Sequence, residues 1–290
     1  MRFGVVFPQI EVSQDPEALP AIARAVEQLR YDSLLFYDHV VGAEHADREP
    51  PLWGPYTEND PFHDPFVAMG FAAAMTERIE LATGVLILPQ RQTVLVAQQA
   101  ADVAILSHGR LRLGVGAGWN WVEYDALGQD FASRGRRLSE QVPLLRRLWS
   151  ERLVSFDGEF DRIERGCINP RPLAPIPVWF GGFGEAAFQR ASRLGDGFSF
   201  AGDVDSAVDG LRRLRSLLAD AGRADDSFGT ELIMTRARSA TDVLDAATRW
   251  QQLGGSHVSI LTMKNGLPDH AAHIEHLAAV KTSIDDRFPT

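Results

Sequence analysis

An apolar run that ends in an acid and a histidine is the first feature with chemical potential. In LLFYDHV, Asp38 and His39 come directly after Leu34, Leu35 and Phe36. The apolar run is typical of a buried strand, so the pair would emerge where that strand ends. A histidine exchanges protons near neutral pH, and an adjacent carboxylate could fix its orientation. The pair indicates either acid–base catalysis or an ordinary polar start to a loop.

Glycines also occur at the ends of two later strand-like stretches, where the backbone is not covered by side chains. In TGVL, Gly84 marks a bulge, the close approach of a ligand, or harmless packing. In LGVGAGWNWVEY, Gly114, Gly116 and Gly118 alternate before Trp119. This alternation would bare one face of a strand for a flat ligand. A dinucleotide fingerprint fits poorly, because the spacing is G-x-G-x-G and a tryptophan follows.

A further glycine segment joins a strand to a helix-like stretch. In WFGGFGEAA, Gly181, Gly182 and Gly184 surround Phe183. Free N–H groups at the start of a helix bind anions, and glycine lets a phosphate come close. The alternative is a plain turn between a strand and a helix. Three glycines favour the anion site.

Two groups of side chains favour structural roles. Three histidines recur at every third residue of a helix-like stretch, which predicts a solvated face in preference to a metal site; they are His270, His273 and His276. Arg134, Arg136 and Arg137 begin another helix-like stretch. Surface ion pairs are the favoured interpretation for these arginines, and substrate binding is the alternative.

Composition excludes several classes of function. The 290 residues carry 39 acidic and 29 basic side chains, a formal net charge of −10, which argues against a nucleic-acid or anionic-membrane partner. Cys167 is the only cysteine, so neither an internal disulfide nor a zinc–thiolate cluster can form. No apolar stretch approaches the roughly 20 residues of a membrane helix. We therefore expect a cytoplasmic protein with a small-molecule substrate and no bound metal.

Strand-like and helix-like stretches alternate along the whole chain. About eight such pairs, in a chain of this length, are the sequence form of an α/β protein with a (β/α)8 TIM barrel. We expect a helix after each of the strands at residues 2–8, 33–37, 79–88, 110–116, 177–182, 196–201, 230–237 and 256–262.

Two stretches interrupt the alternation, residues 40–63 and 152–176. The first is rich in proline, tryptophan and acid, and the second contains SFDGEF, which predicts a hairpin. Loops that follow barrel strands carry function, so we expect both to cover a site. Trp53 and Tyr56 are the expected apolar contacts to a substrate. The chain would then be one barrel domain over residues 1–290 with two insertions.

Several segments, taken in order, resemble the bacterial luciferase-like superfamily of flavin and deazaflavin oxidoreductases. They are YDSLLFYDHV, TERIELATGVLILP, ILSHGRLRLGVGAGW with EYDALG, FASRGRRLSEQVPLLRRLW and PVWFGGFGEAAFQRASRLGDGF, and they span most of the chain. The D-H pair is most similar to the branch that uses the deazaflavin coenzyme F420. The resemblance implies a homodimer of barrels that bind a flavin-type ring at the C-terminal ends of their strands.

The resemblance also implies where the cofactor lies. The peptide between Gly84 and Val85 should be cis and should back the ring, which is a sharp test because such bonds are rare outside proline. The cofactor phosphate should lie near residues 116–119 and 182–184. The implied cofactor-binding residues are Asp38, Thr83, Gly84, Val85, Gly116, Gly118, Trp119, Gly182, Phe183 and Gly184.

In the F420 branch, the histidine that matches His39 handles a proton beside hydride transfer, and Asp38 would support it or contact the ring. This implies an oxidoreductase that moves hydride between F420 and a small organic substrate. Sugar-phosphate dehydrogenases of the branch have an acid where this chain has Trp119, which disfavours a sugar phosphate.

Two other functions remain open. One is an FMN-dependent monooxygenase that takes reduced flavin from a partner reductase and activates oxygen. Luciferase, however, has an arginine near Ala117 that helps to hold its flavin phosphate, and this chain lacks it. The other is a barrel that binds a flavin without turnover.

Overall fold

The strands of the chain close into an eight-stranded parallel barrel in the computed structural model, which describes residues 1–223 and 227–289. The strands are β1 (Arg2–Val6), β2 (Ser33–Phe36), β3 (Glu80–Thr83), β5 (Leu111–Gly116), β8 (Val178–Gly181), β9 (Gly197–Gly202), β10 (Gly229–Met234) and β11 (His257–Leu261). The first strand pairs with the last, and β3 pairs with β5, so the ring is complete. The predicted TIM barrel is confirmed.

The barrel strands are buried on both faces, which explains their continuous apolar runs. Leu34 of β2 packs in the large core between strands and helices. Its neighbour Leu35 points the other way, into a smaller cluster inside the barrel with Val6, Ala82 and Ile233. Because successive side chains of a strand point to opposite faces, β2 contributes both to the core outside the barrel and to the cluster inside it.

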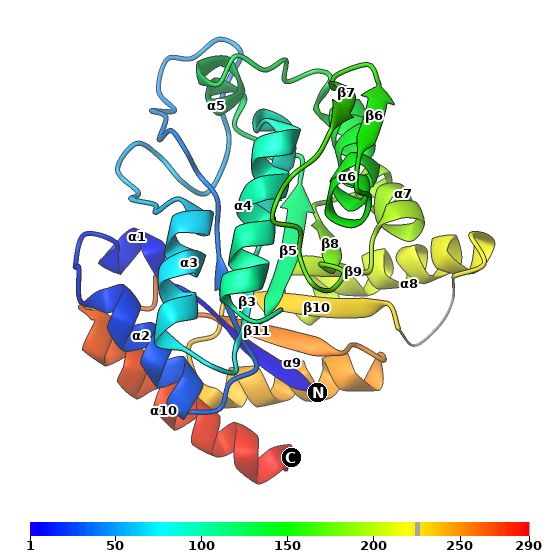
Figure 1. Cartoon of the computed structure of the whole chain (residues 1–290). Helices are drawn as coiled ribbons and strands as arrows, with labels where there is room; N and C mark the ends of the chain where they lie inside the picture. Colours follow the sequence, from blue (N-terminus) through cyan, green and yellow to red (C-terminus); the bar gives the residue numbers. More distant parts are fainter. Residues whose placement is uncertain (224–226, 290) are drawn as a thin grey trace.

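A helix follows each barrel strand and packs against the outside of the barrel (Figure 1). These helices are α2 (Ala18–Gln28), α3 (Pro65–Met75), α4 (Thr93–Leu106), α6 (Arg134–Ser150), α7 (Glu185–Leu194), α8 (Val204–Asp220), α9 (Ala240–Gln252) and α10 (His270–Arg287). The start of α3 shows how local sequence sets a boundary. The Asp64 side chain accepts hydrogen bonds from the N–H groups of Phe66 and Val67, and Pro65 occupies the first turn, a combination that is typical of a helix start.

The third predicted strand, residues 79–88, is interrupted. It divides into β3 and β4 (Leu86–Ile87), and the peptide between Gly84 and Val85 is cis, as the resemblance implied. After this bulge, β4 pairs with the end of β5 and runs into the short helix η1 (Leu88–Gln90). The bulge therefore interrupts the third strand, and the chain continues alongside β5 beyond it.

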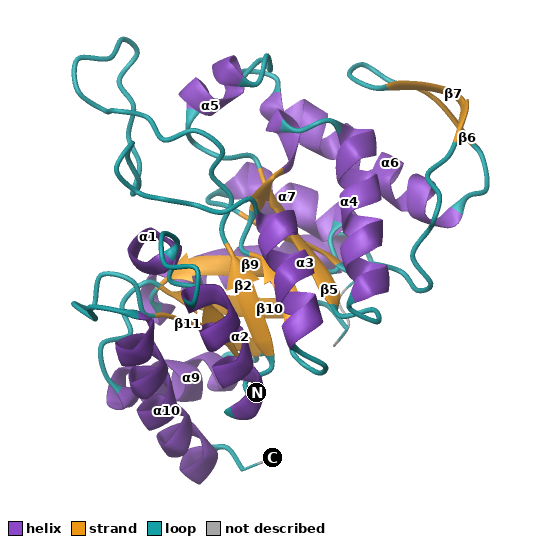
Figure 2. Ribbon diagram, turned by 60° about the vertical axis from the view of Figure 1, so that its left-hand side comes forward, coloured by secondary structure: helices purple, strands orange, loops and turns teal. Residues whose placement is uncertain are grey.

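The first interruption of the βα pattern, residues 40–63, forms a long loop beside α5 (Trp121–Ala126) at one end of the barrel (Figures 1 and 2). The second contains the predicted hairpin of β6 (Val154–Asp157) and β7 (Arg162–Gly166), which lies apart from that loop and packs against α6, where Glu140 accepts from the N–H of Phe160 at 2.9 Å. A short helix, α1 (Gln9–Val12), follows β1. The two chain termini lie at the opposite end (Figures 1 and 2). Within the described residues, no helix combines the length and apolar character that crossing a membrane requires.

Candidate active site

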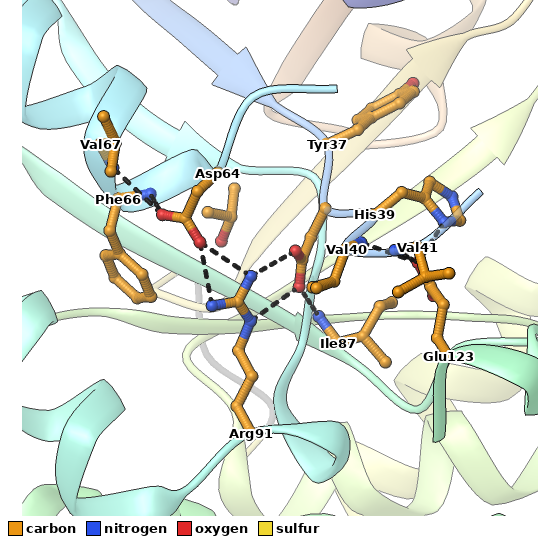
Figure 3. Close-up of polar contacts among 12 residues, drawn as sticks. Tyr37, His39, Val40, Val41, Asp64, Phe66, Val67, Ile87, Arg91 and Glu123 are labelled. Atoms are coloured by element: carbon orange, nitrogen blue, oxygen red, sulfur yellow. Dashed lines mark hydrogen bonds and ion pairs between the residues drawn. The ribbon is translucent and has the colours of Figure 1, made fainter. Parts of the chain in front are cut away.

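His39 lies just beyond β2 and contacts Glu123 of α5 (Figure 3). The Nδ1 atom of His39 is 3.1 Å from Oε1 of Glu123. The same oxygen accepts hydrogen bonds from the backbone N–H groups of Val40 at 2.8 Å and Val41 at 3.2 Å. This oxygen already accepts two N–H groups and has no proton to donate. When the imidazole is neutral, Nδ1 must therefore carry the proton and donate it to Glu123.

This tautomer leaves Nε2 of His39 as the proton acceptor. No hydrogen-bond partner for Nε2 is found among residues 1–223 and 227–289. The side chain of Glu123 is 2% exposed, so its charge is poorly screened by solvent. A histidine in this state can take a proton from a bound molecule, and the carboxylate stabilises the positive charge that results.

Local sequence explains why Glu123 points toward His39. Asn120 is the N-cap of α5, and its side chain accepts a hydrogen bond from Val122 N–H at 3.1 Å. At the other face of the helix, the Tyr124 hydroxyl donates to the carbonyl of Ala117 at 2.7 Å. These two contacts fix a short helix that could not hold its orientation alone. The pattern N-x-x-E predicts a capping box, in which Glu123 would bond to its own helix. In the structure, the Glu123 side chain instead accepts hydrogen bonds from the loop that follows β2.

Aromatic rings surround the imidazole of His39. Ring centroids of Phe62, Tyr56 and Trp119 lie 4.8, 5.2 and 5.5 Å from that of His39. Burial raises the pKa of the Tyr56 hydroxyl, so this group stays neutral. The walls beside the imidazole are therefore uncharged and largely apolar, which suits an uncharged substrate.

The loop of residues 40–63 is held over these rings by two close contacts. Gly54 packs flat on Trp119, since a Cβ atom at this position would lie 2.3 Å from the indole ring. The Lys264 ammonium, beyond β11, donates to the Pro55 carbonyl at 3.2 Å and lies 5.6 Å from the centre of the Tyr56 ring. Tyr56 is thus placed beside His39. The Trp53 side chain is 80% exposed, so its contact with a substrate stays a prediction.

Asp38 takes a different role from the orienting acid that the sequence suggested. Its carboxylate accepts from the N–H of Ile87 at 2.9 Å and from Arg91 Nη2 at 2.6 Å. Arg91 also donates to Asp64 at 3.1 Å (Figure 3). Successive side chains at a strand end point in opposite directions, so Asp38 faces away from the partner of His39. The expectation that Asp38 orients the imidazole is wrong, and Glu123 does so.

Asp38, Arg91 and Asp64 form a cluster of three charged groups that holds the chain after the bulge in place. Burial alone would lower the pKa of Arg91, but Asp38 and Asp64 outweigh it and raise the pKa. The cluster ties the end of β2 to η1 and to the start of α3. Local sequence patterns do not reveal this cluster, because Arg91 lies 53 residues from Asp38 and 27 residues from Asp64 in the chain.

The glycines of β5 were expected to leave room for a ligand, but in the structure they leave room for the bulge after β3. A Cβ atom on Gly116 would lie 2.5 Å from the Val85 side chain, and one on Gly181 would lie 2.7 Å from it. The Thr83 hydroxyl donates to the carbonyl of Gly114 at 2.6 Å. The predicted shelf of bare backbone is thus filled by the bulge after β3.

The turn that precedes α7 remains open. Gly182 and Gly184 have φ values of 142° and 82°, which glycine adopts most readily, and Phe183 is 83% exposed. Gly184 is the N-cap of α7 and provides no side-chain cap. A Cβ atom on Gly184 would meet nothing within 4 Å. Uncapped N–H groups with free space before them are the features that a phosphate requires, and phosphate binding at this turn stays a prediction.

The remaining histidine prediction needs correction. His273 is completely buried, and its Nδ1 lies 2.8 Å from the Thr262 hydroxyl. The three histidines of α10 therefore do not form a solvated face, because this helix covers the end of β11. No cluster of three or more potential metal-ligating side chains is found in the described part of the chain.

Two relatives cover most of this chain. An uncharacterized protein of Mycobacterium tuberculosis is 35% identical over 221 residues, which cover 74% of this chain and 75% of the relative. An F420-dependent glucose-6-phosphate dehydrogenase of Nakamurella multipartita is 32% identical over 225 residues, which cover 76% of this chain and 63% of the relative.

Two solved structures share the fold at low sequence identity. The monooxygenase RslO1 from Streptomyces bottropensis aligns with a TM-score of 0.79 at 17% identity, covering 99% of this chain and 98% of its own. An F420-dependent secondary alcohol dehydrogenase in complex with an F420–acetone adduct has the same TM-score and identity and covers 98% of each chain. The family model for luciferase-like monooxygenases matches residues 1–284. With this match and the barrel described above, the chain belongs to the luciferase-like monooxygenase family.

Proposed function

We propose that the chain is an oxidoreductase that transfers hydride between coenzyme F420 and a small organic substrate. The observation that carries the proposal is the pairing of His39 with Glu123, which prepares one ring nitrogen to exchange a proton. Hydride transfer to or from an alcohol or carbonyl requires such a proton exchange. The names of an F420-dependent relative and an F420-dependent fold neighbour support this choice of cofactor.

The residues of this chain would divide the work as follows. The open turn of residues 182–184 would hold the cofactor phosphate, and the bulge at Val85 would back the ring. When bound, F420 supplies a carbon centre that accepts or gives hydride. His39 would take the substrate proton through Nε2 or return it. Phe62 and Tyr56 would exclude water from the reacting groups.

The aromatic walls also limit the substrate. Trp119 stands where sugar-phosphate dehydrogenases of this branch have an acid, and Tyr56 is neutral. We therefore propose an uncharged organic substrate in place of a sugar phosphate. As part of the same proposal, the enzyme works in the cytoplasm, without a nucleic-acid or membrane partner.

An FMN-dependent monooxygenase supplied by a partner reductase is the second candidate. The monooxygenase named among the fold neighbours favours it. The two cofactors differ at ring position 5. FMN has a nitrogen there, and its reduced form can react with oxygen to give a peroxide, whereas F420 has a carbon there and is restricted to hydride transfer. A barrel that binds its cofactor without turnover is the third candidate.

One titration separates these candidates. The purified protein is titrated with F420 and with FMN, and binding is followed by fluorescence. Micromolar affinity for F420 with little for FMN, followed by turnover on a panel of alcohols and carbonyl compounds, is the expected result. Oxygen consumption with FMN and a reductase would favour the second candidate. Tight binding with no turnover on the panel would favour the third.

The proposed enzyme is a homodimer that pairs through α3 and α4. Both helices are apolar on several faces, and such helices are usually buried. Their outward side chains include Val67 at 72% exposure, Leu95 at 52% and Phe71 at 46%. A contiguous apolar surface of this kind is typical of a protein interface. A second copy of the chain would bury it.

A further inference from the structure

Three arginines near the barrel mouth form no ion pair within the described residues. They are Arg134 and Arg137 of α6, for which the sequence predicted ion pairs, and Arg190 of α7, and they are here called the arginine cluster. Within the described residues, none of the three lies within 4 Å of a carboxylate oxygen. Arg136, on the same helix, does pair with Glu159 at 2.9 Å. The expectation of surface ion pairs therefore holds for Arg136 alone.

The arginine cluster is held in place by backbone carbonyls. Arg190 Nε donates to the carbonyl of Gly135 at 3.0 Å, so its guanidinium lies across the first turn of α6. A Cβ atom at Gly135 would lie 2.2 Å from Arg190, so glycine makes this approach possible. Arg134 donates to the carbonyl of Phe131 at 2.8 Å and stacks 3.8 Å above its ring. These contacts orient the guanidinium groups but leave their charges unneutralised.

The charges of the cluster also repel one another. Burial lowers the pKa of Arg190, and the neighbouring charges of Arg134 and Arg193 lower it further. Arg137 donates to the carbonyl of Arg91 at 3.4 Å, and its buried Nε has no partner among the described residues. Grouped positive charges of this kind, with donors to spare, are a site that favours an anion.

Two contacts place the cluster next to the proposed cofactor site. The Tyr124 hydroxyl bonds to Ala117, at the end of β5. The Tyr124 ring also lies 5.3 Å from the ring of Phe131, above which the Arg134 guanidinium stacks at 3.8 Å. Arg190 belongs to α7, which begins at the open turn of residues 182–184 (Figure 1). The cluster thus lies beside the ends of β5 and β8, between which the phosphate is proposed to sit.

We propose that the arginine cluster is a second anion subsite, which binds the carboxylates of a cofactor tail that continues beyond the phosphate. This inference rests on the proposed F420 function, since F420 carries a glutamate tail after its phosphate and FMN ends at its phosphate. The open turn with its uncapped N–H groups already suits one phosphate. Three further positive charges on two helices exceed what a single phosphate needs. Guanidinium groups are well matched to carboxylates, which they bind with two parallel hydrogen bonds.

The test compares three deazaflavins by fluorescence titration: complete F420, F420 without its glutamates, and the deazaflavin truncated before the phosphate. Arg190→Gln and Arg134→Gln are each expected to weaken binding of complete F420 by about tenfold, as for the loss of a charge-assisted hydrogen bond. Neither should alter binding of the two shorter ligands. Arg136→Gln is the matched control, since its guanidinium already pairs with Glu159. Added salt should weaken binding of complete F420 more in the wild type than in Arg190→Gln.

The outcomes separate this inference from the proposed function. If the wild type binds all three deazaflavins with equal affinity, the proposed function stands and the tail subsite is refuted. If the arginine variants lose affinity for F420 without glutamates as well, the cluster binds the phosphate and the tail assignment is wrong. If the wild type binds no deazaflavin, both proposals fail. Unchanged affinity of both variants for the truncated ligand serves as the check that they are folded.

Discussion

Glu123 and His39 are 84 residues apart in sequence, yet their side chains meet at 3.1 Å beyond the ends of two barrel strands. A single carboxylate oxygen holds the imidazole and also the two backbone N–H groups that follow it. This arrangement fixes the start of the loop over the site and the tautomer of the histidine together. Glu123 is therefore a positioning residue for the proposed proton transfer.

Replacing Glu123 by glutamine removes the negative charge but keeps the size of the side chain and a hydrogen-bond acceptor. In Glu123→Gln the side chain can still accept from Val40 and Val41, but the charge that stabilises a protonated His39 is gone. We expect kcat to fall by about 100-fold, within the usual contribution of acid–base catalysis, while the Kd for F420 changes little. Histidine ¹⁵N spectra provide a second readout, since the wild type should show Nδ1–H for His39. An unchanged kcat together with an unchanged tautomer would remove the proposed role.

Removal of the His39 imidazole should abolish hydride transfer and leave the affinity for F420 nearly unchanged. His39→Ala is expected to bind F420 with nearly wild-type affinity and to lose at least about 100-fold in hydride transfer. Stopped-flow absorbance of the cofactor measures that step directly. His108→Asn is a suitable control, because His108 is exposed, lies after α4, and has a φ of 56° that asparagine tolerates. Full turnover in His39→Ala would refute the assignment.

The Asp38–Arg91–Asp64 cluster should matter for stability. Arg91→Leu would leave the buried carboxylate of Asp38 without its charged partner. We expect the free energy of unfolding to fall by about 3 kcal/mol, as for other broken buried ion pairs. Arg136→Leu breaks an exposed pair with Glu159, and its cost should stay below about 1 kcal/mol. Chemical denaturation of both variants tests the contrast, and equal losses would contradict it.

One buried histidine, His273, and one half-buried histidine, His257, should make the fold sensitive to mild acid. Burial lowers the pKa of His257 to about 4 and that of His273 to about 4. An unfolded histidine titrates near pH 6.5, so the unfolded chain binds more protons between pH 6.5 and 4. Stability should therefore be full above pH 6.5 and fall as the pH drops through this range.

Urea denaturation at pH 7 and pH 5 measures this effect. The free energy of unfolding should be lower at pH 5 by about 2 kcal/mol for each of the two histidines. The difference should shrink in His273→Gln, whose side chain keeps a polar atom near Thr262 and does not titrate. The same difference in the variant as in the wild type would show that His273 does not contribute.

The outward face of α3 provides a test of the proposed dimer. Phe71→Lys places a charge at the centre of the exposed apolar surface and should convert a dimer into a monomer in sedimentation velocity. Ala219→Lys, at an exposed position of α8 on another side of the barrel, should leave the assembly unchanged (Figure 1). A wild type that sediments as a monomer at micromolar concentration would rule out this interface.

The sequence alone determined the barrel. Apolar runs such as Leu34 to Phe36 are buried on both faces only in a sheet covered on both sides, and the helix that follows each run carries its own signals. Asp64 and Pro65 mark the start of α3 in this way. These signals act within a few residues, so they can be found without knowing the fold.

Only the tertiary structure decided which groups meet at the mouth of the barrel. The sequence placed His39 at a strand end and offered Asp38, its neighbour, as the orienting acid. The structure assigned that role to Glu123, because strand geometry turns adjacent side chains apart and barrel closure brings distant strand ends together. For the same reason, the glycines of β5 proved to accommodate Val85 from a neighbouring strand. Contacts across a barrel depend on which strands are neighbours, and no local pattern in the chain encodes this.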